Sequence, residues 1–195
     1  MCIRDRELVA KSRSYRGYDP DRRLTREELE RFVACARLAP SSVNRQPLKY
    51  YLAWEEEQAA AIQPLTGWAA ALREHRLPHP GHCPPAFIVI CQDTALASET
   101  DRYLKDVGIV AQTMLLAAAE QGLGGCMIGS FPQRKLAEVL HLPEGVLPML
   151  VVAFGKPDET VVLTDAGPDG SVTYYRDEND VHYVPKRRLE DLILN

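Results

Sequence analysis

The sequence lacks any long apolar segment. No uninterrupted apolar run in the 195 residues reaches the roughly 18 to 20 residues that a membrane span needs. The first residues, MCIRDRELVAKS, also lack the apolar centre of a signal peptide. We therefore expect a cytoplasmic protein with no membrane partner. MCIRDR fits poorly before a helix start, which leaves two alternatives, a native start and a foreign leader.

Neither charge nor cysteine follows a pattern that indicates a special partner. The formal net charge of −4 gives no general reason to expect nucleic acid. The HPGHC segment, 79–83, has no fourth metal ligand nearby, so we interpret it as a proline-rich surface loop and expect no metal. We expect reduced thiols, because the cysteines are odd in number and lack CxxC spacing. They are Cys2, Cys35, Cys83, Cys91 and Cys126.

The motifs of several enzyme classes are missing as well. The sequence contains no GxSxG, no HExxH and no P-loop lysine, and its five histidines have no obvious carboxylate or cysteine companion. Hydrolysis by a catalytic triad is therefore disfavoured, and we expect no catalytic side chain. A protein that leaves its chemistry to a bound cofactor has this kind of sequence, rich in binding groups and poor in acids and bases.

Helix and strand patterns alternate along the chain. Thr25 and Glu28 form a capping box that predicts a helix start, and Pro40 stops that helix. The 101–121 segment is apolar nearly all round, which predicts a core helix that ends at Gly122. Further helices are predicted at 55–62, 67–75 and 132–140, and strands at 49–54, 87–91 and 147–154. This order predicts a layered α+β or α/β fold, with one domain over 1–195 and an extended arm over 156–195.

Gly122 to Gly129, GLGGCMIG, resembles a dinucleotide-binding fingerprint only superficially. That fingerprint needs a strand before its first glycine, whereas a long helix precedes this one. Two alternatives remain. The segment either brings its backbone and N–H groups close to a flat ligand, or it is a helix cap followed by a turn into a strand.

Three polar segments are candidate binding sites. Arg13-Ser14-Tyr15-Arg16 places two guanidinium groups and a hydroxyl together, which suits phosphate or a solvated face. The basic run 186–188 allows the same two interpretations. The nine residues of APSSVNRQP, 39–47, combine two hydroxyls and two carboxamides without a glycine, which favours a polar, planar ligand over a bare turn.

These segments, in this order, resemble the nitroreductase family of FMN-dependent oxidoreductases. The resemblance rests on RSYR, APSSVNRQP, the long helix running into GLGGCMIGSF, the strand ending in VVAFGKP, and KRRLEDLI, and it extends along nearly the whole chain. It implies an α+β sandwich with a central, mostly antiparallel sheet flanked by helices. It also implies an intertwined homodimer that holds one FMN at each of two interface sites.

The resemblance also assigns residues to the FMN. Arg13, Ser14 and Arg16 hold the phosphate and the ribityl-pyrimidine side. Lys186 and Arg187 close on the phosphate, and Arg188 fits the spacing equally well.

Two further segments complete the implied site. The resemblance implies that the backbone of Met127, Ile128 and Gly129 lies against the isoalloxazine. It also implies that a main-chain N–H near Gly129 points at the flavin N5, where a donor favours the reduced flavin. The loop that reaches across from the partner subunit lines the isoalloxazine and ribityl chain with Pro40, Ser41, Ser42, Asn44 and Gln46.

The implied activity is a ping-pong transfer of hydride from NADH or NADPH to a nitroaromatic, quinone or similar conjugated small molecule. The segment between Trp54 and Pro84 is short where larger relatives carry substrate-covering insertions, so the acceptor stays open. Alternatives are a flavin-binding or flavin-sequestering protein without activity, and a divergent flavin chemistry on the same fold. A plain structural dimer would leave the polar loop and both basic clusters unexplained.

Overall fold

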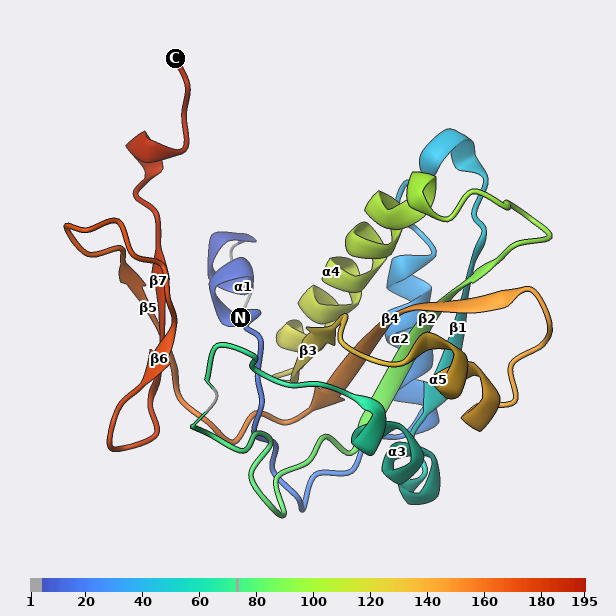
Figure 1. The fold of residues 1–195 in the computed structure, drawn as a ribbon, viewed down its shortest axis with the longest axis horizontal. Coiled ribbons are helices and arrows are strands. Elements are labelled where there is room, and N and C mark those ends of the chain that lie inside the picture. The colour runs from blue at the N-terminus through green and yellow to red at the C-terminus, as the bar shows by residue number, and fades with distance from the viewer. Residues whose placement is uncertain (1–4, 73) are drawn as a thin grey trace.

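A four-stranded antiparallel sheet lies at the centre of the fold (Figure 1). The computed structural model describes residues 5–72 and 74–195, so that most of MCIRDR, and Cys2 with it, lies outside the described residues. The strands are β1 (Leu48–Ala53), β2 (Ala86–Asp93), β4 (Val146–Gly155) and β3 (Gly124–Ile128), in that spatial order. All three predicted strands are confirmed, and β2 is buried on both faces as expected.

One face of the sheet packs against α2 (Arg26–Ala36) and α4 (Leu104–Glu120). Ile88 and Phe154 point to this side, and the Phe154 ring stacks on Phe32 of α2 at 5.1 Å between centroids. The predicted capping box is present. The Thr25 side chain accepts from the Glu28 N–H, and the Glu28 carboxylate accepts from the Thr25 N–H. The helix ends at Ala36, before Pro40.

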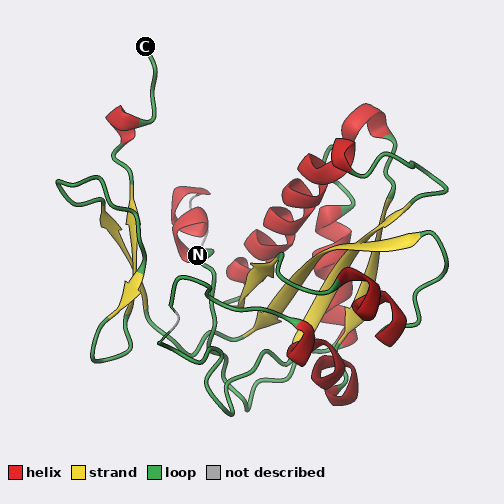
Figure 2. Cartoon of the chain, in the orientation of Figure 1, coloured by secondary structure: helices red, strands yellow, loops and turns green. Residues whose placement is uncertain are grey.

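The opposite face packs against α3 (Glu56–Ile62) and α5 (Gln133–Val139). Neighbouring strand residues alternate between the two sides, so that Phe87 and Val151 face this second core while Ile88 and Val152 face the first. The result is a helix–sheet–helix sandwich, the predicted α+β fold (Figure 2).

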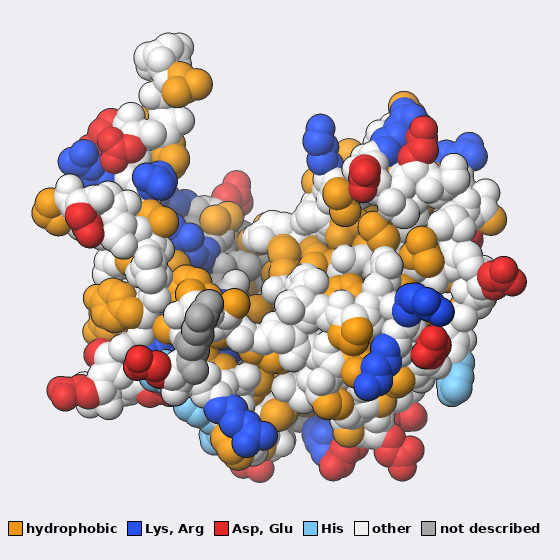
Figure 3. Space-filling model, viewed as in Figure 1, with side chains coloured by type: hydrophobic (Ala, Val, Ile, Leu, Met, Phe, Trp, Pro, Cys, Tyr) orange, Lys and Arg blue, Asp and Glu red, His pale blue; other side chains and the backbone are white. Residues whose placement is uncertain are grey.

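The long predicted helix is α4, preceded by a 3₁₀ turn, η3 (Asp101–Tyr103), and followed by Gly122 at φ +73°. It is buried along one side only. Leu104 and Ile109 on the other side are 53% and 39% exposed. Figure 3 shows hydrophobic side chains spread over this face of the molecule. Among the described residues the outer side of α4 is mixed, since Leu104 and Ile109 lie there together with the exposed Lys105 and Gln112.

The predicted helix at 67–75 is wrong. After η2 (Gln63–Leu65) the described residues of this stretch form turns and irregular loop. The Gly67 N–H donates to the Ser130 carbonyl at 2.7 Å, and the Trp68 indole donates to Thr66 Oγ1 at 2.8 Å. Ala69 has a φ of +46°. These contacts hold the backbone in a non-helical path, which overrides the helix propensity of the alanines.

The C-terminal segment, expected as an extended arm, contains a small sheet beside the main body (Figure 1). Its strands are β5 (Val161–Asp165), β7 (His182–Lys186) and β6 (Tyr175–Arg176), followed by η4 (Leu189–Asp191). β5 and β7 pair in parallel. The short α1 (Asp5–Lys11) contacts α4 and has no buried residue.

Candidate functional site

Five of the predicted site residues line one cavity of about 290 Å³. It lies between α4, β3, the segment after α1 and the C-terminal sheet, so that it joins three distant parts of the sequence. We call it the basic cavity, because three of its lining side chains are cationic and none of the described lining residues is acidic. The predicted residues in its wall are Arg13, Ser14, Arg16, Met127 and Lys186.

The segment that carries the arginines is held against β3 by its backbone. Ser14 forms a parallel bridge with Gly125, and the Tyr15 N–H donates to the Gly125 carbonyl at 3.0 Å. A Cβ at Gly124 would overlap the Tyr15 ring, and one at Gly125 would overlap the Ala153 carbonyl oxygen. Of the two interpretations of the glycine-rich segment, the helix cap with a turn into a strand describes 122–125. The close neighbours of these glycines are the chain's own atoms.

The two arginines of the basic cavity keep unused donors. Arg13 Nη2 donates to the Val9 carbonyl at 2.6 Å, and Arg16 Nη1 donates to the Ser14 carbonyl at 3.1 Å. The Nε of each arginine is buried and has no hydrogen-bond partner within the described chain. Burial lowers the pKa of the Arg13 guanidinium. Buried donors without partners are costly, and an anion in the cavity would satisfy them.

His182 is a residue of this cavity that the sequence did not reveal. It is 2% exposed, its Nδ1 lies 3.5 Å from Arg16 Nη1, and its Nε2 has no partner within the described chain. Burial, together with the charges of Arg16 and Arg176, lowers the pKa of His182 to about 4. The alternation of the VHYVPK strand was the available signal, since it places His182 on the same side as Val184 and Lys186.

A buried ion pair contacts the backbone of Arg16, a residue of the basic cavity. The Arg176 and Glu159 side chains are 1% and 4% exposed and pair with each other. The Glu159 carboxylate also accepts the backbone N–H of Arg16. Glu159 is thus paired with Arg176, and the Arg16 guanidinium forms no ion pair with any carboxylate of the described residues.

The late basic residues separate into two groups. Lys186, the last residue of β7, lines the basic cavity, whereas Arg187 is exposed and does not. The Arg188 Nε lies 3.3 Å from Asp191 and 3.4 Å from Glu190. Neither Arg187 nor Arg188 lines the basic cavity, so that the choice between them as a second phosphate contact stays a prediction.

The polar loop, Pro40 to Gln46, lies at a second cavity of about 220 Å³. Its anchor is Asp106 of α4, 3% exposed, which accepts from Ser41 Oγ at 2.6 Å and from the Ser42 N–H at 2.9 Å. The Gln46 side chain donates to Asn44 Oδ1 at 2.9 Å. The loop contains a 3₁₀ turn, η1 (Ser42–Asn44).

Within one chain the structure does not bring this loop to the basic cavity. No residue of the loop lines the basic cavity, and along α4 the loop's anchor Asp106 lies six residues, about 9 Å, from Gln112, which does line it. Asp106 was not predicted as a site residue. It lies in the first turn of a helix whose sequence is apolar nearly all round, and that pattern carries no signal for a contact with the loop.

The three predicted residues around the end of β3 point to different places. Met127 lines the basic cavity. Ile128 is 3% exposed and belongs to the core on the other face of the sheet, with Leu136 of α5. Gly129 is exposed and lies beside Gly67 in a third hollow. The side chain of Ile128 is therefore unavailable to the basic cavity, because side chains alternate along a strand.

Two kinds of feature are absent from residues 5–72 and 74–195. No helix there is long and apolar enough to cross a bilayer. That part of the chain also holds no group of three or more His, Cys, Asp or Glu side chains arranged to bind a metal ion.

Comparisons with known proteins agree with the resemblance drawn from the sequence. A protein of Methanothermobacter thermautotrophicus, provisionally named NADH dehydrogenase/NAD(P)H nitroreductase, is 27% identical over 157 residues, which are 78% of this chain and 77% of that protein. The Bacillus subtilis FMN reductase [NAD(P)H] is 28% identical over 183 residues, covering 83% and 69%.

The fold has solved relatives as well. The crystal structure of a provisionally named nitroreductase from Exiguobacterium sibiricum, in complex with FMN, superposes with a TM-score of 0.69 at 21% identity, covering 82% of this chain and 90% of that one. The model of the nitroreductase family matches residues 9–156, a span from α1 to the end of β4. The chain belongs to the nitroreductase family.

Proposed function

We propose that the chain is an FMN-dependent NAD(P)H oxidoreductase that reduces nitroaromatic, quinone or similar conjugated acceptors. The observation that carries the proposal is the basic cavity, where residues from three separate segments meet. The FMN reductase and NAD(P)H nitroreductase names of the relatives support the same activity.

The donors of the basic cavity fit a phosphate monoester. Arg13, Arg16 and Lys186 supply the positive charge, and the buried Nε atoms of both arginines lack partners within the described chain. Arginine suits phosphate because its planar donors can bind two oxygens at once. We assign these residues, with Ser14, to the FMN phosphate, and Met127 to the wall beside it.

When bound, FMN would supply the redox chemistry, accepting hydride from NADH or NADPH and passing electrons to the acceptor in ping-pong order. The chain's own contribution is to bind and orient. The polar loop would serve the flavin of a second copy in a homodimer, because within one chain it lies away from the basic cavity. Ser42, Asn44 and Gln46 would contact the ribityl chain and ring, and backbone near Gly129 the flavin N5.

Two sequence predictions remain predictions beside this proposal. One is the cytoplasmic location. The other is a single domain over 1–195 with the C-terminal segment as an arm.

Absorption spectroscopy of the purified protein tests the proposed function. We expect flavin bands after incubation with FMN and gel filtration, and bleaching of those bands by NADH or NADPH under anaerobic conditions. Recovery of the bands on adding a quinone or nitroaromatic compound would complete the cycle. Bound flavin that neither nucleotide bleaches would favour a flavin-sequestering protein instead, and absence of bound flavin would refute the proposal.

A further inference from the structure

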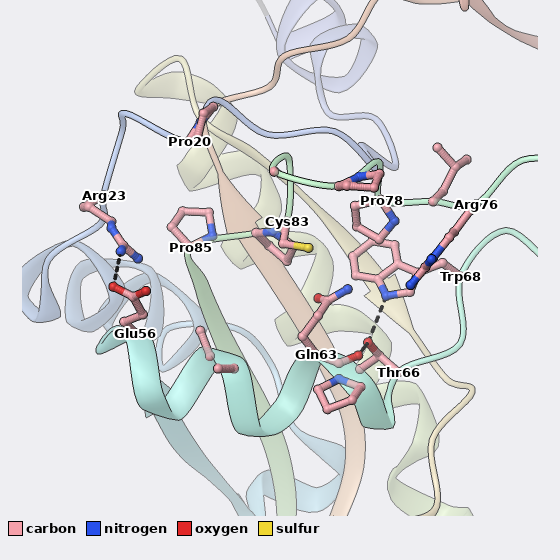
Figure 4. A pocket seen from close by; sticks show the side chains of 17 residues that line it. Pro20, Arg23, Glu56, Gln63, Thr66, Trp68, Arg76, Pro78, Cys83 and Pro85 are labelled. Carbon is pink, nitrogen blue, oxygen red and sulfur yellow. Dashed lines mark hydrogen bonds and ion pairs between the residues drawn. The ribbon is translucent and has the colours of Figure 1, made fainter.

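A separate cavity of about 760 Å³ lies between α3, η2 and the loop over 76–85 (Figure 4). None of the residues assigned to FMN lines it. We propose that it binds an aromatic carboxylate that also carries a hydrogen-bond donor. The inference does not depend on the proposed function.

The wall of this cavity is largely apolar and rigid. Trp68 lies at one end, where its half-buried ring packs against the second core and also lines the cavity, and its indole N–H already donates to Thr66 Oγ1. Six prolines supply further apolar surface with few rotatable bonds. Small-molecule sites typically enclose roughly 300 to 1,000 Å³, mostly apolar, with a few polar groups that fix orientation. A flat aromatic ring suits such a wall, because it stacks on an indole face.

Two polar groups in the wall lack partners within the described chain. Gln63 Oε1 is buried without a hydrogen bond, and Figure 4 shows its side chain reaching into the cavity from η2. Arg76 is exposed at the edge of the cavity and forms no ion pair with any described residue, whereas Arg23 at the other end is paired with Glu56 at 2.6 Å. A carboxylate would therefore find its cation at Arg76, and a ligand O–H or N–H would find its acceptor at Gln63.

Two histidine–aspartate contacts join the loop beside the cavity to the C-terminal segment. His79 Nε2 lies 3.0 Å from Asp180 Oδ2, and His82 Nδ1 lies 2.8 Å from Asp158 Oδ2. The HPGHC segment thus contacts the C-terminal segment at two points. Cys83, next to His82, lines the cavity with a free thiol and serves as a reporter of occupancy.

Calorimetric titration with 4-hydroxybenzoate tests the charge assignment, with neutral 4-hydroxybenzamide as the matched ligand. The full chain is used, with and without added FMN. We expect Arg76→Gln to weaken 4-hydroxybenzoate binding about tenfold and to leave 4-hydroxybenzamide unchanged. Arg134→Gln, which removes an exposed cation from α5, is the control and should change neither. Equal binding of 4-hydroxybenzoate to the wild type and Arg76→Gln, or no binding at millimolar concentration, would overturn the proposal.

Alkylation by N-ethylmaleimide locates the ligand. Peptide mass spectrometry of the wild type should show slower labelling of Cys83 when 4-hydroxybenzoate is present. Cys35, exposed on α2 outside the cavity, provides the internal control and should react at an unchanged rate. This measurement needs no variant, so it decides the matter even if Arg76→Gln does not fold. Equal labelling of Cys83 with and without 4-hydroxybenzoate would place binding elsewhere and refute the site.

Discussion

Arg13 is the residue that tests the proposed function most simply, because it brings a positive charge to the basic cavity and its buried Nε has no partner among the described residues. Arg13→Ala should weaken FMN binding by roughly 2 to 4 kcal/mol, about 30- to 700-fold, as expected for losing one partner of a charged pair. Quenching of flavin fluorescence measures the affinity. Arg134→Ala on α5 is the control. If Arg13→Ala bound FMN as tightly as the control, the phosphate assignment would be wrong.

His182 gives a prediction for pH. Its pKa of about 4 lies below the ordinary 6.5, so between these values the unfolded chain binds a proton that the folded chain does not. The free energy of unfolding should therefore fall as pH drops from about 6.5 to about 4, by on the order of 3 kcal/mol from this group. Urea unfolding across this range measures it. His182→Gln should flatten that part of the profile, and an unchanged slope would contradict the assignment.

Asp106 should matter for the polar loop rather than for the core. Asp106→Ala leaves the Ser41 hydroxyl and the Ser42 N–H without their acceptor, at a cost of about 1 to 3 kcal/mol. Thermal unfolding, with proteolysis of the loop as a second readout, checks this. Asp101→Ala at the exposed start of η3 is the matched control. Equal stability and equal proteolysis of the two variants would show that Asp106 does not anchor the loop.

At the scale of elements, local signals predicted what local interactions decide. The capping box placed the start of α2, and the apolar run of 87–91 placed β2, because each depends on residues close in sequence. The helix predicted at 67–75 was wrong because a distant contact decides this stretch, since the Gly67 N–H donates to Ser130, more than sixty residues away in sequence. The parallel pairing of β5 with β7 likewise cannot be predicted from the residues of β5 alone, because it depends on a strand that is distant in sequence.

The contact between β3 and the segment that carries Arg13 and Arg16 leads to a prediction about Gly125. A Cβ at Gly125 would overlap the Ala153 carbonyl oxygen and come within 2.8 Å of Leu115 Cδ2. Gly125→Ala should therefore destabilise the fold by about 1 to 3 kcal/mol. Gly17→Ala is the control, because the new Cβ there meets its nearest neighbours at an ordinary 3.6 Å. Denaturant unfolding compares the two, and equal stability would show that β3 tolerates the side chain.

In the molecule as a whole, several large apolar side chains of the described residues are exposed. The outer side of α4 exposes Leu104 and Ile109, and the C-terminal tail exposes Leu189, Leu192 and Leu194. Apolar side chains that are exposed singly are ordinary on soluble proteins, so these residues alone define no interface, and the homodimer stays a prediction.

Some residues of the basic cavity and the polar loop could be predicted from the sequence, and others could not. Arg13, Arg16 and Lys186 are charged residues in short clusters, and such clusters stand out in a sequence. His182 and Asp106 gain their significance from burial and from partners more than sixty residues away. Tertiary structure alone supplies that information.

Assembly provides a prediction for the molecule as a whole. If the polar loop serves the flavin of the second copy, then FMN occupancy should fall with dimer content on dilution. Analytical ultracentrifugation, with detection at 280 nm for protein and at the flavin band, follows both. A monomeric boundary with full flavin occupancy would contradict the shared site.

The most direct measurement of the central claim is a crystal structure grown with excess FMN. We predict the phosphate within hydrogen-bond distance of Arg13, Arg16 and Lys186, and the Ser42 to Gln46 segment of a second copy beside the isoalloxazine. An FMN bound elsewhere, with these basic side chains facing solvent, would contradict the account.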